Sequence, residues 1–510
     1  MSHLIIAPIV LPAVLAPFML MVLRHHLDLQ RIFSVAGTVG FLALALALFG
    51  QAADGDIIVY ELGAWPAPFG IVLVLDRLSA LMVVLTAVLA NMVLLYAIGT
   101  NWDKRGHHFH PLFQFQLMGL VGAFLTGDAF NLFVFFEVLL IASYGLMIHG
   151  GGTVRLRAGL QYVVYNLIGS TLFLFALGTI YAVTGTLNMA DLAERVASLP
   201  ADDTALIRVG AVLLLLVFSI KAAVLPLHFW LPGSYANAPA PVAALFAIMT
   251  KVGAYSILRM YTLVFAPDLE ISAGLVGTWL LPAALATLAV GMIGILGAKD
   301  IARLVAFAAI GSMGTLLTAI ALFTPLSAGA AIYYIVHSTL ATALMFLIAD
   351  MVIERRGPAI SAGPAFAQRG LISAVYFAAA IALAGMPPLS GFLGKLMVLQ
   401  AAASSPNQAL IWTVILVSSL IGIVGFARAG SLVFWKTQED PDDEQPKDDE
   451  AEPEPTTTPS LPFVAAFGLL AGLVALTVFA GPALTYSEAT AAQLFDPTAY
   501  INAVLKEGAE

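Results

Sequence analysis

Apolar runs follow one another along almost the whole sequence, and each is about as long as a helix that crosses a bilayer. Spanning the hydrocarbon core takes roughly 17–25 apolar residues. Only 10% of the 510 residues are charged and 60% are hydrophobic, whereas soluble domains carry about a quarter charged residues. The sequence therefore predicts an all-α integral membrane protein with about 14 transmembrane helices. The approximate runs are 4–23, 31–50, 78–99, 112–127, 129–149, 160–183, 205–230, 239–265, 271–297, 301–323, 327–353, 370–400, 409–435 and 461–484.

The first run is interpreted as a retained helix. Only three residues precede it, with no basic segment, and no small-residue cleavage site follows it, so it does not resemble a removed signal. The chain has no cysteine, which excludes disulfides, iron–sulfur ligation and thiolate zinc sites on it.

Basic residues fall mostly on one side of the predicted bundle. Of the 22 Lys and Arg residues, fourteen lie in loops on one side, five lie on the other, and three lie inside apolar runs. Because cytoplasmic loops carry the excess of Lys and Arg, we expect the first side to be cytoplasmic. Both termini then lie outside.

Three segments outside the runs have their own patterns. Residues 51–77 contain two short β-type stretches around Gly63 and predict a β-hairpin on the outer face. Residues 187–200 are amphipathic and predict an outer surface helix. Residues 436–460 hold ten Asp or Glu against two Lys. This tract is either a docking segment for a partner or a solvated cytoplasmic loop, and we favour the loop.

Four charged residues lie near the middle of apolar runs: Glu137, Lys221, Lys251 and Lys395. A charge at the centre of a membrane helix costs roughly 2.5–3.5 kcal/mol on insertion scales, and such residues are usually functional. They are therefore expected to face one another or water, not lipid. One acid and three bases make a set that can hold and pass protons.

Glu137 and Lys221 are expected to act as a pair. Glu137 has no basic residue in its own helix, so it needs a partner from another one. The alternative is a fixed ion pair that only holds the bundle together. Pro226 follows Lys221 by about one turn and predicts a break in that helix. Broken membrane helices mark transport sites. His228, beyond the break, is either a relay member or a donor to freed carbonyls.

Lys251 and His337 are expected between this pair and the far end of the set. The segment 232–241 is a tight turn rich in Pro and Gly, so antiparallel neighbours place Lys221 and Lys251 at similar depth. His337 lies well inside the eleventh run. It is either a relay member or a hydrogen-bonded packing residue.

Lys395 follows a second break, at Pro387 and Pro388, five runs after the first. An offset of five helices reverses membrane orientation, which is the geometry of an inverted repeat. We therefore divide the chain into five parts. These are 1–111 (three helices with the outer hairpin), 112–265 (first repeat), 266–435 (second repeat), 436–460 (acidic cytoplasmic loop) and 461–510 (last helix and tail).

Two segments reveal a resemblance to a known family. Residues 126–144 read TGDAFNLFVFFEVLLIASY and residues 231–246 read LPGSYANAPAPVAALF. From about the second to the thirteenth run, the sequence resembles the antiporter-like family shared by complex I membrane-arm subunits and multisubunit Mrp (Pha, Mnh) cation/proton antiporters. The two segments are especially similar to the D-type subunits of the Mrp (Pha, Mnh) antiporters. Members of the complex I M-type differ from this chain by a Glu at the position of Lys395.

The resemblance implies which residues act and how. In the family, a Glu on the fifth helix pairs with a Lys on the broken seventh, and Lys on the eighth and Lys or Glu on the twelfth complete a hydrophilic axis. Glu137, Lys221, Lys251 and Lys395 match these positions. The implied proton path runs from the Glu137–Lys221 pair to Lys251, then through water and His337 to Lys395.

The resemblance also implies a setting. We expect a proton-translocating subunit of a Na⁺ or K⁺/H⁺ antiporter in the bacterial inner membrane. Its partners would be membrane subunits of the A, B, C, E, F and G types. We expect no cofactor, no bound metal, no nucleic-acid partner and no enzyme activity. Two other classes remain open: a proton-pumping subunit of a complex I-like oxidoreductase or membrane hydrogenase, and a stand-alone transporter of an organic substrate.

Overall fold

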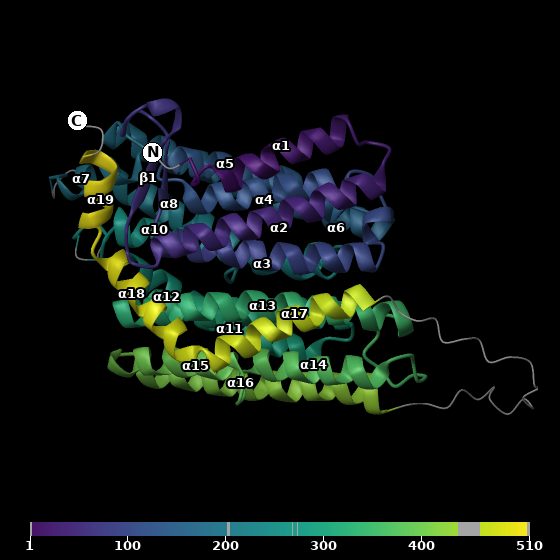
Figure 1. Ribbon diagram of the computed structural model, residues 1–510. Coiled ribbons are helices and arrows are strands. Elements are labelled where there is room, and N and C mark those ends of the chain that lie inside the picture. The colour runs from purple at the N-terminus through teal and green to yellow at the C-terminus, as the bar shows by residue number, and fades with distance from the viewer. Residues whose placement is uncertain (1–2, 201–203, 268, 273, 437–459, 507–510) are drawn as a thin grey trace, which may run out of the picture.

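The computed structural model describes residues 3–200, 204–267, 269–272, 274–436 and 460–506, which form one bundle of helices (Figure 1). Ten helices within these ranges are long and apolar enough to cross a membrane. Each predicted apolar run contains a helix or a broken helix. The first six are α1 (Ala7–Met21), α2 (Leu27–Ala52), α3 (Arg77–Gly99), α4 (Phe109–Leu125), α5 (Ala129–Met147) and α6 (Thr153–Thr184).

The remaining α-helices include the other membrane-length helices and several short ones. They are α7 (Met189–Ala197), α8 (Ala205–Lys221), α9 (Trp230–Tyr235), α10 (Ala240–Leu263), α11 (Leu275–Gly297), α12 (Ile301–Leu322), α13 (Pro325–Arg356), α14 (Arg369–Ala384), α15 (Ser390–Ala401), α16 (Gln408–Gly430), α17 (Ser460–Val478), α18 (Ala480–Phe495) and α19 (Thr498–Lys506). A short 3-10 turn, Leu227–Phe229, precedes α9.

Polar caps set where several helices begin. Asp76 accepts a hydrogen bond from the backbone of Ser79 at the start of α3, and Asp128 and Asp300 cap α5 and α12 in the same way. Thr324 forms a capping box with Ser327 at α13. These side chains satisfy backbone N–H groups that a helix leaves unpaired at its first turn. The caps explain why these four helices begin beside the predicted edges of their apolar runs.

Three helices form the buried centre of the bundle. Helices α10, α12 and α13 are almost wholly buried, whereas α2, α16 and α17 bury only about a third of their spanning windows. In Figure 1, α1 to α4 lie along one side and α14 to α16 along the opposite side. Outer helices expose large apolar side chains, such as Leu174 and Phe175 of α6. A surface of this kind suits lipid or other membrane subunits.

The predicted outer hairpin and surface helix are both present. Strands β1 (Ile58–Glu61) and β2 (Val72–Leu75) pair antiparallel. Helix α7 buries its apolar face against α6, α10 and α19. In Figure 1, β1, α7 and α19 gather at one end of the bundle. The acidic tract 437–459 lies outside the described residues.

The last predicted run, 461–484, corresponds to two helices. Helix α17 ends at Val478, and α18 begins after Phe479 and crosses the bundle obliquely toward the end that carries α19 (Figure 1). Gly481 and Pro482 lie in the first turn of α18, where Pro is favoured. Within the described residues, the predicted tail is helical up to residue 506, and α18 packs on α13 and α10.

Candidate functional site

Glu137 is half-buried on α5 and faces α6. Its carboxylate accepts a hydrogen bond from the Ser170 hydroxyl of α6. Lys221 is the last residue of α8 and is only 4% exposed. Its ammonium lies 3.5 Å from the side-chain oxygen of Asn166, also on α6. Asn166 and Ser170 are four residues apart and therefore neighbours on one face of α6.

The expected pair is thus not a direct ion pair. Within the described chain, no ion pair joins Glu137 to Lys221. The physical reason is that α6 packs against both α5 and α8 and places its amide and hydroxyl between the two charges. A cavity of about 20 Å³ beside Asn166, Ser170 and Lys221 is large enough for one water. Sequence reasoning missed Asn166 and Ser170, although their four-residue spacing in an apolar run was a signal.

The break after Lys221 lies where Pro226 predicts it. Helix α8 ends at Lys221, and Ala223 adopts a positive φ of 55°. The freed backbone groups find partners: Leu225 N–H donates to the Thr287 hydroxyl at 2.8 Å. The Trp230 indole donates to the carbonyl of Ile220 at 3.0 Å.

His228 lies in the short turn after the break. It is buried, and no described residue forms a hydrogen bond with its Nδ1 atom. Its ring lies 4.5 Å from that of Phe229, centroid to centroid. The freed carbonyl of Ile220 is satisfied by Trp230, and the two expectations for His228, relay member or donor to freed carbonyls, both stay open.

Lys251 occupies the middle of α10 and is fully buried. No described residue offers a hydrogen-bond partner to its Nζ atom. Two residues on, Gly253 allows α10 to touch the end of α8: a Cβ there would lie 2.7 Å from the carbonyl oxygen of Phe218 and 2.8 Å from the backbone N of Ala222. This close approach brings the segment that carries Lys251 against the end of α8 that carries Lys221.

His337 lies on α13 and is fully buried. Its Nδ1 atom is 2.9 Å from the Ser390 hydroxyl at the start of α15, and its Nε2 atom has no partner among the described residues. Lys251 and Lys395 are both close enough to interact with its charge. The ring fits because residue 391 is glycine, where a Cβ would lie 2.9 Å from it. His337 thus touches the second broken helix.

Lys395 lies in α15, after a break that runs from Gly385 to Leu389. Its ammonium donates to the Ala384 carbonyl and to the Ser419 hydroxyl of α16, both at 2.8 Å. The first bond is what a helix anchor would make. The second adds a polar group that sequence reasoning missed.

A further polar group lies beside His337. The hydroxyls of Ser312 on α12 and Ser338 on α13 are 2.8 Å apart, and Ser312 also lies 3.4 Å from the Tyr334 hydroxyl. The Tyr334 ring in turn is 5.3 Å from that of His337. Together these groups form a polar axis across the buried centre, from Glu137 on α5 to Lys395 on α15.

The sequence is similar to known membrane proteins. The family described as "NADH:quinone oxidoreductase/Mrp antiporter, TM" matches residues 126–422. The D-type subunit of a probable K⁺/H⁺ antiporter of Rhizobium meliloti is 38% identical over 99% of this chain and 98% of that protein. The D-type subunit of a Na⁺/H⁺ antiporter of Bacillus subtilis is 39% identical over 99% of this chain and 100% of that protein. A chain in the structure of the Mrp complex from Dietzia sp. has a TM-score of 0.88 and 30% identity, covering 99% of this chain and 100% of that one.

Proposed function

This chain belongs to the NADH:quinone oxidoreductase/Mrp antiporter family, and on that premise we propose that it is the proton-translocating, D-type subunit of a multisubunit Na⁺/H⁺ or K⁺/H⁺ antiporter. Its place is the bacterial inner membrane, with both termini outside. The family membership and the full-length similarity to D-type antiporter subunits support this assignment.

The observation that carries the proposal is that Lys251 is buried and that no described residue forms a hydrogen bond with its Nζ atom. A permanently charged ammonium that is buried without a partner costs several kcal/mol. Among the described residues, no hydrogen bond to the Lys251 ammonium offsets that cost. A residue that is charged only while it carries a proton in transit has no such standing cost. Lys251 therefore suits transfer and does not suit a structural role.

The first part of the proposed path lies at Glu137 and Lys221. The carboxylate stabilises the proton on Lys221 across the α6 side chains, and Ser170 and Asn166 hold the two groups apart without a direct contact. When α5 and α8 separate further, this stabilisation weakens. The proton then moves from the Lys221 ammonium to the neutral amine of Lys251, which lies on the helix that touches the end of α8.

The second part of the path runs through His337 to Lys395. His337 accepts the proton at a ring nitrogen, and its contact with Ser390 places it against the helix of Lys395. Lys395 holds the proton between Ala384 and Ser419 before release. His228 lies in the turn after the break that follows Lys221 and serves the first half of the path. The cation moves elsewhere in the complex, driven by the charge changes along this axis.

The proposed partners are the other membrane subunits of such a complex, of the A, B, C, E, F and G types. The Dietzia relative is itself part of an Mrp complex. The broad exposed apolar faces of helices such as α2 and α6 would provide contact area. The complex I-like role receives less support, because the relatives that are 38–39% identical over the full length carry antiporter names.

The test uses everted membrane vesicles from a host that produces the whole complex. Lys251→Met replaces an unpaired ammonium by an apolar chain of similar length, which buried sites tolerate. We expect normal amounts of complex and a loss of at least tenfold in cation-dependent dissipation of the pH gradient. Lys299→Met, at an exposed loop lysine, is the matched control and keeps its activity. Full antiport by Lys251→Met would remove the proposed core of the mechanism.

A further inference from the structure

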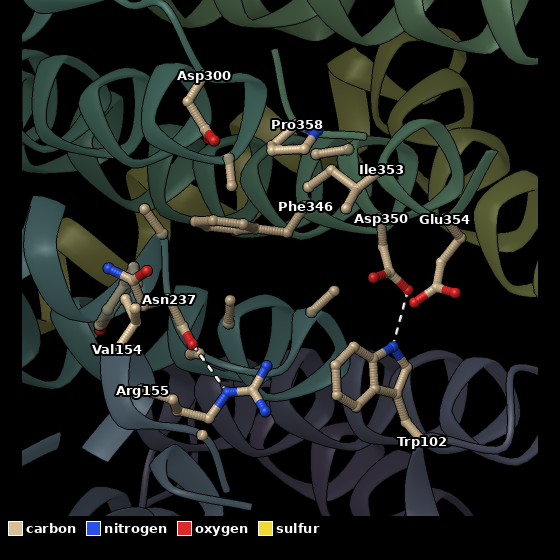
Figure 2. A pocket seen from close by; sticks show the side chains of 18 of the residues that line it. Trp102, Val154, Arg155, Asn237, Asp300, Phe346, Asp350, Ile353, Glu354 and Pro358 are labelled. Atoms are coloured by element: carbon tan, nitrogen blue, oxygen red, sulfur yellow. Dashed lines mark hydrogen bonds between the residues drawn. The ribbon is translucent and has the colours of Figure 1, made fainter. Parts of the chain in front are cut away.

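A crevice of about 680 Å³ opens at the end of the bundle that carries Arg105 and Arg155. It lies between the loop before α6, the segment around α9 and the end of α13 (Figure 2). Its lining includes Trp102, Arg155, Asn237, Phe346 and Asp350. None of these residues belongs to the polar axis described above. The crevice reaches the central helix α13, which also carries His337.

Asp350 is the most buried charged residue in this lining, at 3% exposed. One carboxylate oxygen accepts hydrogen bonds from the Tyr96 hydroxyl at 2.8 Å and from the Trp102 indole at 2.9 Å. In Figure 2 the other oxygen points away from Trp102. Within the described chain, no ion pair to Asp350 is formed.

The nearby charged residues are engaged elsewhere. Arg105 stacks on the Trp102 ring at 3.8 Å and pairs with Glu354 at 2.9 Å. Arg155 donates to the carbonyls of Asn237, His149 and Gly151. The other ionisable groups around Asp350 are Tyr96 on α3, Arg355 on α13 and Asp300 at the start of α12. Asp350 is therefore held by neutral donors, and no salt bridge fixes it in the charged form.

A row of side chains leads from Asp350 into the bundle. Phe346, Thr342 and Ser338 precede it at steps of four residues and form one ridge of α13. The Thr342 hydroxyl is buried and finds no hydrogen-bond partner among the described residues. Ser338 bonds to Ser312, which contacts Tyr334 beside His337. At about 1.5 Å per residue, Asp350 lies roughly 20 Å along α13 from His337.

An unpartnered buried hydroxyl is unusual, because leaving it unpaired costs about 1–3 kcal/mol. Thr residues elsewhere in the bundle, such as Thr318 and Thr339, bond to the carbonyl four residues earlier. Thr342 lies between a crevice and a hydroxyl pair, where a group free to donate and accept can pass a proton.

We propose that Asp350 is the acceptor that loads protons from the crevice into the polar axis, with Thr342 as the relay hydroxyl. The inference rests on the proposed antiport function. A proton from crevice water binds a carboxylate oxygen of Asp350 and makes it neutral. When the Phe346 ring moves aside and water bridges the gap, that proton passes to Thr342, whose own hydroxyl proton passes on to Ser338. Ser338 in turn gives its hydroxyl proton to Ser312 and Ser312 gives its own to Tyr334. The transferred proton ends on the Nε2 atom of His337, the ring beside Tyr334. Asp350 returns to its ionised form, so the step is balanced.

The test compares Asp350→Asn with matched controls in everted vesicles that carry the whole complex. Asn keeps an oxygen that accepts from Tyr96 and Trp102 but cannot take up the proton. We expect at least tenfold slower antiport across a pH series, at normal complex levels, and recovery by Asp350→Glu. Glu354→Gln, at a carboxylate that is 42% exposed, stays within twofold of the parent protein. Parent-like rates for Asp350→Asn at every pH would overturn the proposal.

Thr342→Val provides a second and independent arm. It removes a hydroxyl that makes no hydrogen bond to the described residues, so the fold loses nothing and the thermal midpoint stays equal or rises. We expect at least fivefold slower antiport with that stability, and recovery by Thr342→Ser. A structural role for Thr342 predicts the reverse: lower stability and unchanged rates. That result would contradict the relay.

A third readout separates this inference from the proposed function. Infrared difference spectra of the purified complex, taken as the pH is stepped, should contain a protonated carboxyl band that is absent from Asp350→Asn. If the parent complex moves no protons with Na⁺ or K⁺, the antiport assignment fails, yet this band still reports whether Asp350 exchanges protons. Identical spectra for the parent and Asp350→Asn would refute Asp350 as a proton acceptor.

Discussion

The three buried lysines have different surroundings although the sequence presents them as equivalents. Lys221 lies 3.5 Å from an amide oxygen, Lys251 has no partner among the described residues, and Lys395 has a carbonyl and a hydroxyl at 2.8 Å. Hydrogen-bond acceptors stabilise an ammonium in a dry interior. Of the three, Lys395 is therefore the best suited to hold a proton and Lys251 the best suited to pass it on.

Lys395→Arg distinguishes a site of proton release from a helix anchor. Arg keeps the charge and the donors but does not release its proton, because its pKa lies above about 12. If Lys395 must release, Lys395→Arg assembles normally and its antiport falls at least tenfold. Lys395→Glu, the charge type of the M-type complex I subunit, keeps partial activity. The measurement is cation-dependent pH-gradient dissipation over a pH series, and near-parental rates for Lys395→Arg would leave the anchor role standing.

At the scale of elements, glycines set how closely the helices of the axis approach. Gly253 puts α10 in backbone contact with the end of α8, and Gly391 makes room for the His337 ring beside α15. Both contacts involve a helix that begins or ends at a break. Small residues allow close helix contact in membranes. These contacts therefore control the spacing between residues that we propose as successive proton carriers.

Gly253→Ala should widen the first of these contacts. The added Cβ would lie 2.7 Å from the Phe218 carbonyl oxygen, so α10 must move away from α8. We expect at least a fivefold loss of antiport while the complex still assembles. Gly178→Ala on α6, where nothing lies within 4 Å of the added Cβ, is the control. Equal rates for the two variants in the vesicle assay would show that the contact does not set the transfer distance.

The sequence predicts the helices and their breaks better than it predicts which side chains of other helices lie beside them. Apolar length and proline predict α8, its break and α15, because these depend on residues close in the chain. The four-residue spacing of Asn166 and Ser170 marks a polar face of α6, but which helices that face meets depends on packing, which no local pattern encodes. A hydroxyl residue in a membrane helix is weak evidence for a functional site. Its side chain often bonds to the backbone of its own helix, as Thr171 does with Leu167. Asp350 does not stand out in the sequence as an intramembrane charge, because it lies only about one turn from the predicted end of its run at 353.

At the scale of the whole molecule, a buried ion pair joins helices at the end of the bundle that carries β1, α7 and α19. Arg259 of α10 bonds to both carboxylate oxygens of Asp76, at 2.6 and 2.9 Å, and its guanidinium lies 5.4 Å from the Tyr500 ring of α19. Tyr486 of α18 donates to the carbonyl of Arg77 at 2.8 Å. These contacts join α3, α10 and the C-terminal helices at the end opposite the crevice.

Arg259→Ala should destabilise the bundle by about 3–5 kcal/mol, because it leaves a buried carboxylate unpaired. Burial alone would raise the pKa of Asp76, but Arg259 outweighs that effect and holds the pKa below its usual range. The stabilisation from Asp76 is therefore complete above the ordinary pKa of an Asp and is lost as the pH falls through the lower pKa of the folded state. The measurement is the thermal midpoint of the detergent-solubilised complex as a function of pH.

Arg195→Ala is the control for this prediction. It breaks the i,i+4 pair with Asp191, which contributes about 0.3–0.5 kcal/mol, and a hydrogen bond to the Thr184 carbonyl, which contributes about 0.5–1.5 kcal/mol. An equal shift of the thermal midpoint in both variants would contradict the role given to the buried pair.

The hydroxyls along the axis have a consequence for membrane tightness. Ser170, Ser390, Ser419 and the Ser312–Ser338 pair lie at or between charged members of the axis. A hydroxyl has a single hydrogen, so each one that passes a proton is left pointing the opposite way and must rotate back before the next proton arrives. Such a row passes at most one proton per rotation, so the rotation of the hydroxyls limits the proton current. A cell that stores energy as a proton gradient would therefore lose it through this row no faster than the hydroxyls turn.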